Sequence, residues 1–194
     1  MKTMKKTIAL LVAVSMIVGC VIGGTLAWLT HSTGPVTNTF TTSDITVTLE
    51  ETTGKDYKMI PGYTIAKDPK VTVTTGSEEC YLFVKMEKSN NFDIFMTYEI
   101  AEGWTALDGI AGVYYRVIET ADMGKPYNIL KDDQVAVEDA VTKAMMDGLT
   151  SETYPTLTVT AYASQLYKNN TETFTAAEAW ENVPANSSTQ TDGE

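Results

Sequence analysis

Hydrophobic and polar residues alternate with a period of two along much of this chain, which is the pattern of β-strands with one face buried. The first clear example covers residues 44–50, where Ile45, Val47 and Leu49 point one way and polar residues point the other way. Further strands are expected over residues 70–74, 80–87 and 157–163. Since residues 80–87 carry apolar side chains on both faces, we expect both faces of that strand to be covered, as in a sandwich.

The middle of the chain is less regular. Residues 92–100 and 113–120 are predicted to be strands that form a hairpin across the turn residues between them. Over residues 133–149 the apolar period becomes helical, which predicts one short surface helix. Asp132 or Asp133 is positioned to cap the N-terminus of that helix.

A second short helix is predicted over residues 175–180, with Thr173 or Thr175 as its cap. Strands nevertheless dominate, and they are antiparallel wherever the turns are short. The predicted fold is therefore mainly β: an antiparallel β-sandwich with one or two short surface helices. We expect this domain to cover residues 41–183 and a disordered polar tail to cover residues 184–194, where nothing apolar is available to bury.

The N-terminus has the layout of an export signal. Three lysines within the first six residues precede an uncharged apolar run over residues 8–29. Small residues before Trp28 predict cleavage between Ala27 and Trp28, so that residues 1–27 are a signal peptide. Residues 28–40 then form an N-terminal arm ahead of the domain, and the protein meets the membrane only through its signal before cleavage.

Two alternatives remain for this segment. The apolar run is long enough to span a bilayer, so it could stay uncleaved as an N-terminal anchor. Residues 17–20 also match a lipobox, in which the thiol of Cys20 is lipidated. The apolar residues after Cys20 argue against lipidation, because lipoproteins usually turn polar at that point, so Cys20 is expected to be a small residue within the apolar run.

Charge and cysteine content narrow the classes of partner. The formal charge is −11, and removal of the three signal lysines changes it to −14. This charge argues against a nucleic-acid partner and predicts that screening by salt helps any self-association. Cys80 is the only cysteine left after cleavage, so it has no intramolecular disulfide partner and is predicted to be a buried residue of a strand.

Residues that could carry catalysis are few. The single histidine, His31, lies in a Thr-, Ser- and Gly-containing segment that gives it no rigid partner. No zinc-hydrolase motif, nucleophile elbow or phosphate-binding glycine loop is present in the sequence. We therefore predict a protein without enzyme activity, cofactor or metal.

Two other groups of residues have a functional and a structural interpretation. The acidic pairs Glu78–Glu79 and Asp132–Asp133 could bind calcium, but they lack the ligand spacing of a calcium loop and are expected to be solvated loop charges. A set of aromatic residues at strand spacing could form a carbohydrate platform, although packing within and across strands is the expected role. This set comprises Trp104, Tyr114, Tyr115, Tyr154 and Tyr162.

Several segments together resemble the TasA and camelysin family of exported Gram-positive proteins with a SipW-type signal. The resemblance lies in residues 24–30 (Gly-Thr-Leu-Ala-Trp-Leu-Thr), residues 38–40 (Asn-Thr-Phe) and the strand over residues 44–50. Residues 61–73 and the closing strand and helix extend it over most of the chain. It implies a jelly-roll domain, a dedicated signal peptidase, and export to the cell surface or biofilm matrix.

The same resemblance implies a fibre in which the N-terminal arm of one subunit adds as a strand to the next. Such an arm can complete an open sheet edge through main-chain hydrogen bonds, with Trp28, Leu29, Val36 and Phe40 as anchors. The expected partners are thus other copies of the chain or other matrix proteins. Alternatively, the arm pairs within its own chain or stays a flexible leader. The alternative function is a monomeric surface adhesin or binding module, which a sandwich that displays loops would also suit. A camelysin-like metalloprotease is a third hypothesis, which the single histidine disfavours.

Overall fold

The computed structural model describes residues 44–53 and 57–183. The predicted cleavage site at Ala27 and Trp28, the arm over residues 28–40 and the tail over residues 184–194 lie outside the described residues.

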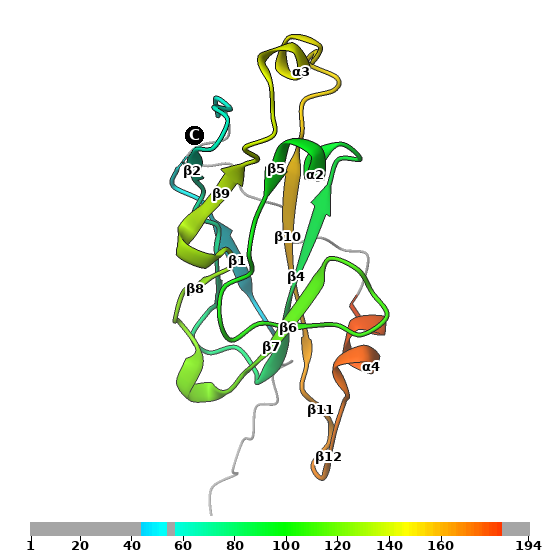
Figure 1. Ribbon diagram of the computed structural model, residues 1–194. Helices are drawn as coiled ribbons and strands as arrows, with labels where there is room; N and C mark the ends of the chain where they lie inside the picture. The colour runs from blue at the N-terminus through cyan, green and yellow to red at the C-terminus, as the bar shows by residue number, and fades with distance from the viewer. Residues whose placement is uncertain (1–43, 54–56, 184–194) are drawn as a thin grey trace, which may run out of the picture. The chain divides into compact units, whose positions relative to one another are not determined.

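Short antiparallel strands make up most of the described chain (Figure 1). The strands are β1 (Val47–Glu50), β2 (Thr64–Ala66), β3 (Lys70–Val73), β4 (Cys80–Lys88), β5 (Met96–Thr97), β6 (Thr105–Ala106), β7 (Val113–Ile118), β8 (Tyr127–Asn128), β9 (Gln134–Val137), β10 (Leu157–Gln165), β11 (Tyr167–Asn169) and β12 (Glu172–Thr173). The α-helices are α2 (Phe92–Phe95), α3 (Lys143–Asp147) and α4 (Ala176–Glu181), and the 3-10 helices are η1 (Thr120–Asp122) and η2 (Lys131–Asp133).

Every strand pair among the described residues is antiparallel, and none of the sheets closes into a barrel. The largest sheet has the order β10-β4-β7-β6, and two three-stranded sheets have the orders β1-β3-β8 and β2-β9-β5. A small β11–β12 hairpin follows β10. These observations confirm the predicted mainly β, antiparallel class.

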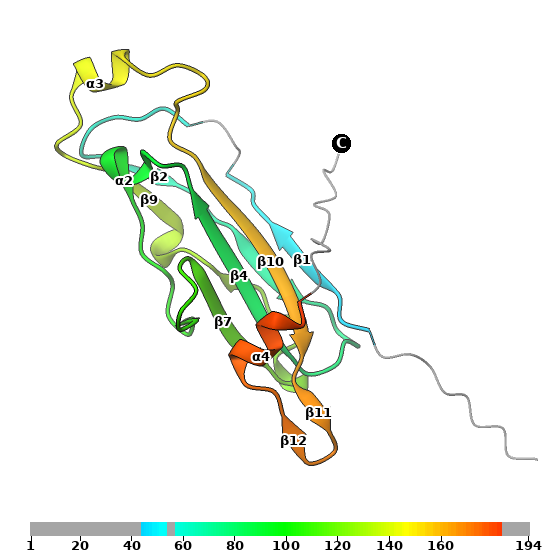
Figure 2. The same ribbon diagram turned by 90° about the vertical axis from the view of Figure 1, so that its right-hand side faces the viewer.

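The four-stranded sheet is covered on both faces, as its sequence pattern predicted. On one face, alternate residues of β4 such as Leu82 and Val84 pack with Val71 and Val73 of β3 into the largest apolar cluster. On the other face, the aromatic residues of β4 pack against α4, which crosses β4 and β10 (Figure 2). Strand β4 is consequently buried or partly buried from Cys80 to Met86, and its last two residues are exposed.

Helix α4 ends the described domain, and its sequence explains its start. Thr175 forms a capping box with Glu178, in which each side chain accepts the other residue's backbone N–H. A hydrogen bond from Lys168, together with the bonds from Thr175, lowers the pKa of Glu178 to about 2. The cap predicted at Thr175 is therefore confirmed. Ala179 is fully buried beneath the helix, and Trp180 packs against Phe83 and Tyr162.

The helix predicted over residues 133–149 is wrong in its first half. Residues Gln134–Val137 form β9, whose Val135 and Val137 point into the core and which pairs with both β2 and β5. Two valines two residues apart fit a strand, since their branched side chains are stiff. Only α3 is helical, and its N-cap is Thr142, whose hydroxyl accepts the Met145 N–H.

Asp132 and Asp133 consequently do not cap a helix. Both residues have positive φ values, 54° and 53°, at the point where η2 turns into β9. Aspartate is among the residues that tolerate this left-handed conformation, because its short polar side chain can hydrogen-bond locally. The pair therefore shapes a turn between Leu130 and β9.

The strand predicted over residues 92–100 is also partly wrong. Its first four residues form α2, because Phe92 and Phe95, three positions apart, are both buried on one helical face. The two-residue strand β5 and a single bridge between Ile100 and Leu130 follow. Strand β7 is confirmed, but its hairpin partner is β6 rather than residues 92–100. With α2, the described residues contain three short α-helices, one more than the upper limit of the prediction.

Candidate functional site

Two sheet edges lie next to each other on one side of the domain. Strand β10 pairs with β4, and β1 pairs with β3; among the described residues neither strand has a second hydrogen-bonded partner strand. β1 and β10 contact each other and run side by side in both views (Figures 1 and 2). The edge of each layer is therefore presented at the same side of the domain.

A groove of about 290 Å³ lies between these two edges. Leu157 and Val159 of β10 and Leu49 of β1 supply its apolar part, and all three are partly buried. Its polar part comes from the end of β1 and from the segment that joins β2 to β3. The complete lining is Leu49, Glu50, Glu51, Lys67, Pro69, Leu157, Thr158 and Val159.

Hydrogen bonds at the two ends of β10 show which side of the strand the N–H and C=O groups of each residue face. The Ser89 N–H donates to the Thr156 carbonyl, and the Leu166 N–H donates to the Glu79 carbonyl, so even-numbered residues of this strand point their backbone groups toward β4. Odd-numbered residues point theirs the other way. The backbone groups of Leu157 and Val159 are thus directed toward the outer edge, beside the groove.

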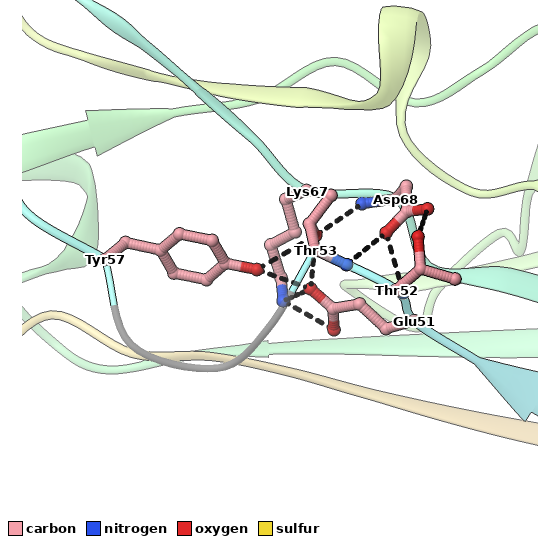
Figure 3. Close-up of polar contacts among 6 residues, drawn as sticks. All are labelled: Glu51, Thr52, Thr53, Tyr57, Lys67 and Asp68. Carbon is pink, nitrogen blue, oxygen red and sulfur yellow. Dashed lines mark hydrogen bonds and ion pairs between the residues drawn. The ribbon is translucent and has the colours of Figure 1, made fainter.

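A buried carboxylate anchors one end of the groove (Figure 3). Asp68, which is 8% exposed, follows β2 and accepts hydrogen bonds from the backbone N–H groups of Thr52 and Thr53, at 2.9 and 3.0 Å. The Thr52 hydroxyl donates a third bond at 2.6 Å. The bonds from Thr52 and Thr53 hold the pKa of Asp68 far below its usual range, against the opposing effect of burial. The chain after β1 is in this way fastened to the β2–β3 connection.

Beside Asp68, an ion pair reinforces the same junction (Figure 3). Lys67 Nζ lies 2.7 Å from a carboxylate oxygen of Glu51, and the two side chains are 14% and 24% exposed. The Tyr57 hydroxyl donates to Glu51 at 2.8 Å, and Lys67 Nζ lies 5.6 Å from the centre of the Tyr57 ring. Burial is the main reason that the pKa of Tyr57 is raised. Glu51 and Lys67 therefore border the groove as a neutral pair.

None of the predicted assembly or cleavage residues can be placed against this groove, since Ala27, Trp28, Leu29, Val36 and Phe40 lie outside the described residues. The same holds for His31 and Cys20. Their roles stay predictions.

Cys80 is fully buried in β4, as predicted. Burial raises the pKa of its thiol to about 12, so the thiolate, which is the nucleophilic form, is not populated near neutral pH. No group of three or more His, Cys, Asp or Glu side chains among residues 44–53 and 57–183 is arranged to hold a metal ion. Within those same ranges, no helix has the length and apolarity needed to cross a membrane.

The acidic pairs have structural contacts. Glu79 accepts bonds from the Thr120 N–H and hydroxyl and from the Tyr167 hydroxyl, which together lower its pKa. It therefore ties η1 to β11. Asp133 accepts a bond from the Asn128 side chain at 3.1 Å.

The aromatic residues mostly pack, as expected. Tyr115 packs with Tyr81 and Phe83, and Tyr162 packs edge-on against Trp180. Tyr114 and Trp104 pack against the largest apolar cluster. Tyr154 differs, because it is 54% exposed. These residues form no single surface platform.

Sequence analysis missed the anchoring role of Asp68. The only signals were a carboxylate placed directly before Pro69 and paired threonines at the end of an apolar strand. Neither signal indicates that the two segments meet, because 15 and 16 residues separate Asp68 from Thr53 and Thr52.

No family model, curated protein or solved structure matches this chain.

Proposed function

We propose that this protein is a secreted structural protein of a Gram-positive cell surface or biofilm matrix, and that its copies join by strand donation. Export would use the signal cleaved between Ala27 and Trp28 by a dedicated signal peptidase. The donated segment would be the arm over residues 28–40. The resemblance of residues 24–30 and 38–40 to exported proteins of the TasA and camelysin family supports both parts. The same resemblance leads us to propose a jelly-roll arrangement of the sheets.

The observation that carries this proposal is the paired edge of β1 and β10. On the outer side of β10, the backbone donors and acceptors of Leu157 and Val159 lie beside the groove, where an edge strand can pair with a further segment. An extended peptide can satisfy them by adding as a further strand, while its apolar side chains fill a neighbouring groove. Leu49, Leu157 and Val159 provide such a groove, and the arm carries the apolar residues Leu29, Val36 and Phe40.

The arm could occupy this edge in its own chain or in another copy. The arm would make the same main-chain hydrogen bonds in both states. The main free-energy cost of moving it to another copy is therefore the entropy lost when separate molecules join. High local concentration favours the second state. Repulsion between the negatively charged copies disfavours assembly, and salt weakens this repulsion by screening the charges.

A truncation tests the role of the arm. Mature protein that starts at Trp28 is compared with a version that starts at Thr41, by light scattering and electron microscopy. We expect oligomers or fibres from the first version, increasing with salt concentration, and monomers from the second. Folded monomers in both cases, at high concentration and in salt, would refute strand donation and favour a monomeric surface adhesin.

A proline pair tests the acceptor edge. Val159→Pro removes an N–H that points away from β4, so we expect assembly to be lost while the domain stays folded, as measured by circular dichroism. Thr158→Pro is the matched control, because it removes an N–H directed at β4 and should destabilise the monomer itself. If the Val159→Pro variant assembles like the parent, β10 is not the acceptor edge.

A further inference from the structure

The single arginine of the chain, Arg116, lies against two aromatic rings. Its guanidinium carbon is 3.7 Å from the centre of the Tyr127 ring and 5.2 Å from the centre of the Trp104 ring. Arg116 belongs to β7 and Tyr127 to β8, which are strands of different sheets. The side chain is thus held where those two sheets meet on the side away from β10.

Neighbouring groups fix the position of this side chain. The Trp104 indole N–H donates to the Asn128 carbonyl at 2.9 Å, which anchors the ring. Gly103 adopts φ +83°, and a Cβ atom at this position would lie 2.7 Å from Arg116 Nη2. Glycine is therefore required here for both its backbone conformation and its lack of a side chain. The guanidinium is held in place by packing.

Its polar edge, in contrast, has no protein partner. Among residues 44–53 and 57–183, no hydrogen bond or ion pair involves the Arg116 guanidinium. Asp122 is the nearby carboxylate, but it pairs with Lys125 at 2.8 Å. Burial lowers the pKa of Arg116, with Tyr127 and Asp122 acting in the opposite direction. The group still keeps its charge, since an arginine pKa starts far above neutrality.

This arrangement differs from that of the lysines. Eight lysines of the described residues pair with carboxylates, in a chain with 25 acidic and 14 basic residues. Arg116 has no such partner among the described residues although it is half-buried, so its N–H groups are left to water or to a ligand. Because the Tyr127 ring lies 3.7 Å from the guanidinium carbon and the Trp104 ring 5.2 Å from it, the N–H groups in the guanidinium plane are the part of this side chain best suited to meet a ligand.

We propose that the in-plane edge of Arg116 is a binding site for a carboxylate group. A carboxylate is planar and accepts two parallel N–H bonds from a guanidinium fork. A phosphate can also accept two such bonds, but its other oxygens project out of that plane, toward the sides where aromatic rings lie against Arg116. Pre-positioning by Trp104, Tyr127 and Gly103 removes much of the ordering cost that a free arginine side chain incurs. The carboxylate can come from an acidic side chain of a second copy or from a free acid.

The single arginine makes the test direct, because its Nε–Hε group gives one resonance in a nitrogen–proton correlation spectrum. Mature protein is titrated with glutarate, with uncharged glutaramide as the control and with inorganic phosphate as the competing anion. We expect a saturable shift with glutarate at a Kd on the order of 1 mM. An absent shift, a shift that glutaramide reproduces, or tighter binding of phosphate would each overturn the carboxylate site.

Two variants that each lose one positive charge serve to exclude non-specific effects. In both, the response to glutarate is measured as the shift of the Trp104 indole resonance. Lys58→Gln removes an exposed cation elsewhere and should leave the glutarate response unchanged, whereas Arg116→Gln should abolish it. An unaltered response in Arg116→Gln contradicts the site.

A dilution series without added acid identifies the source of the carboxylate. A concentration-dependent shift that glutarate reverses assigns it to a second copy, and a response only to glutarate assigns it to a free acid. Both results support the site. The test does not depend on strand donation, because the glutarate response of Arg116 and its loss in Arg116→Gln are expected whether or not the mature protein assembles through its arm.

Discussion

The four-stranded sheet and the β2-β9-β5 sheet are built in different ways. In the first, β4 and β10 run for nine residues each and pair over their whole length. In the second, the strands have three, four and two residues, and they come from three distant parts of the chain. The long strands gain stability from apolar burial on two faces, whereas the short ones depend on turns, buried valines and ionic anchors.

The comparison teaches where this fold tolerates change. Around β4, two apolar clusters share one strand, so a lost side chain leaves a cavity that rigid neighbours cannot fill. Around β9, the cluster consists of Phe95, Val137 and Val141, with partly buried methionines beside them. Methionine is flexible and can adjust to a cavity. We therefore expect graded losses of stability from the first region to the second.

The largest effect is expected for Phe83→Ala. Phe83 is fully buried and its ring packs with those of Tyr81, Tyr115 and Trp180. Its removal should lower the free energy of unfolding by about 3–5 kcal/mol in urea denaturation. Val117→Ala is the matched control on β7, because Val117 is 41% exposed and should cost less than about 0.5 kcal/mol. Equal losses from the two variants would contradict this account of the sheet.

Asp68→Asn should have the next largest effect. It removes the negative charge that accepts hydrogen bonds from two N–H groups and one hydroxyl, where the chain after β1 meets the β2–β3 connection. The free energy of unfolding should fall by about 2–3 kcal/mol at neutral pH. Asp108→Asn, in an exposed turn, is the control and should be nearly neutral.

The pH dependence of stability tests the same carboxylate. Because the folded pKa of Asp68 lies well below the unfolded value of about 3.9, its contribution is fully present above that value. The contribution is lost progressively as the pH falls from about 4 toward the folded pKa. Between pH 6 and pH 3 the parent should therefore lose more stability than Asp68→Asn does. Parallel pH profiles for the two proteins would show that Asp68 is not stabilising as a carboxylate.

Val137→Ala examines the short-stranded sheet. It removes two buried methyl groups from β9 and should cost about 1.5–2 kcal/mol, less than Phe83→Ala. Amide hydrogen exchange provides a second measurement, in which β9 amides should exchange by local opening while β4 amides exchange only on global unfolding. Equal protection of β4 and β9 would mean that the two sheets unfold as one unit.

The smallest effect is expected for Thr175→Ala, which removes the capping box of α4. The loss should be about 1 kcal/mol by thermal denaturation, and Thr175→Ser should restore most of it. A loss in Thr175→Ser as large as that in Thr175→Ala would indicate that the methyl group, and not the hydroxyl, matters.

The sequence by itself determined the strands whose two faces both meet apolar partners, the cap at Thr175 and the burial of Cys80. In those places the local pattern and the tertiary environment favour the same structure. Around residues 92–100 and 133–149 they do not. Apolar residues alternate from Phe92 to Ile100 as in a strand, although Phe92 and Phe95 also share a helical face, and Val137 and Val141, four residues apart, fit both periods. Only pairing with β2 and β5 decided that Gln134–Val137 is a strand. Likewise, the anchor at Asp68 and the aromatic stack of Arg116 arise from segments that meet only in the folded chain, so no local pattern encodes them.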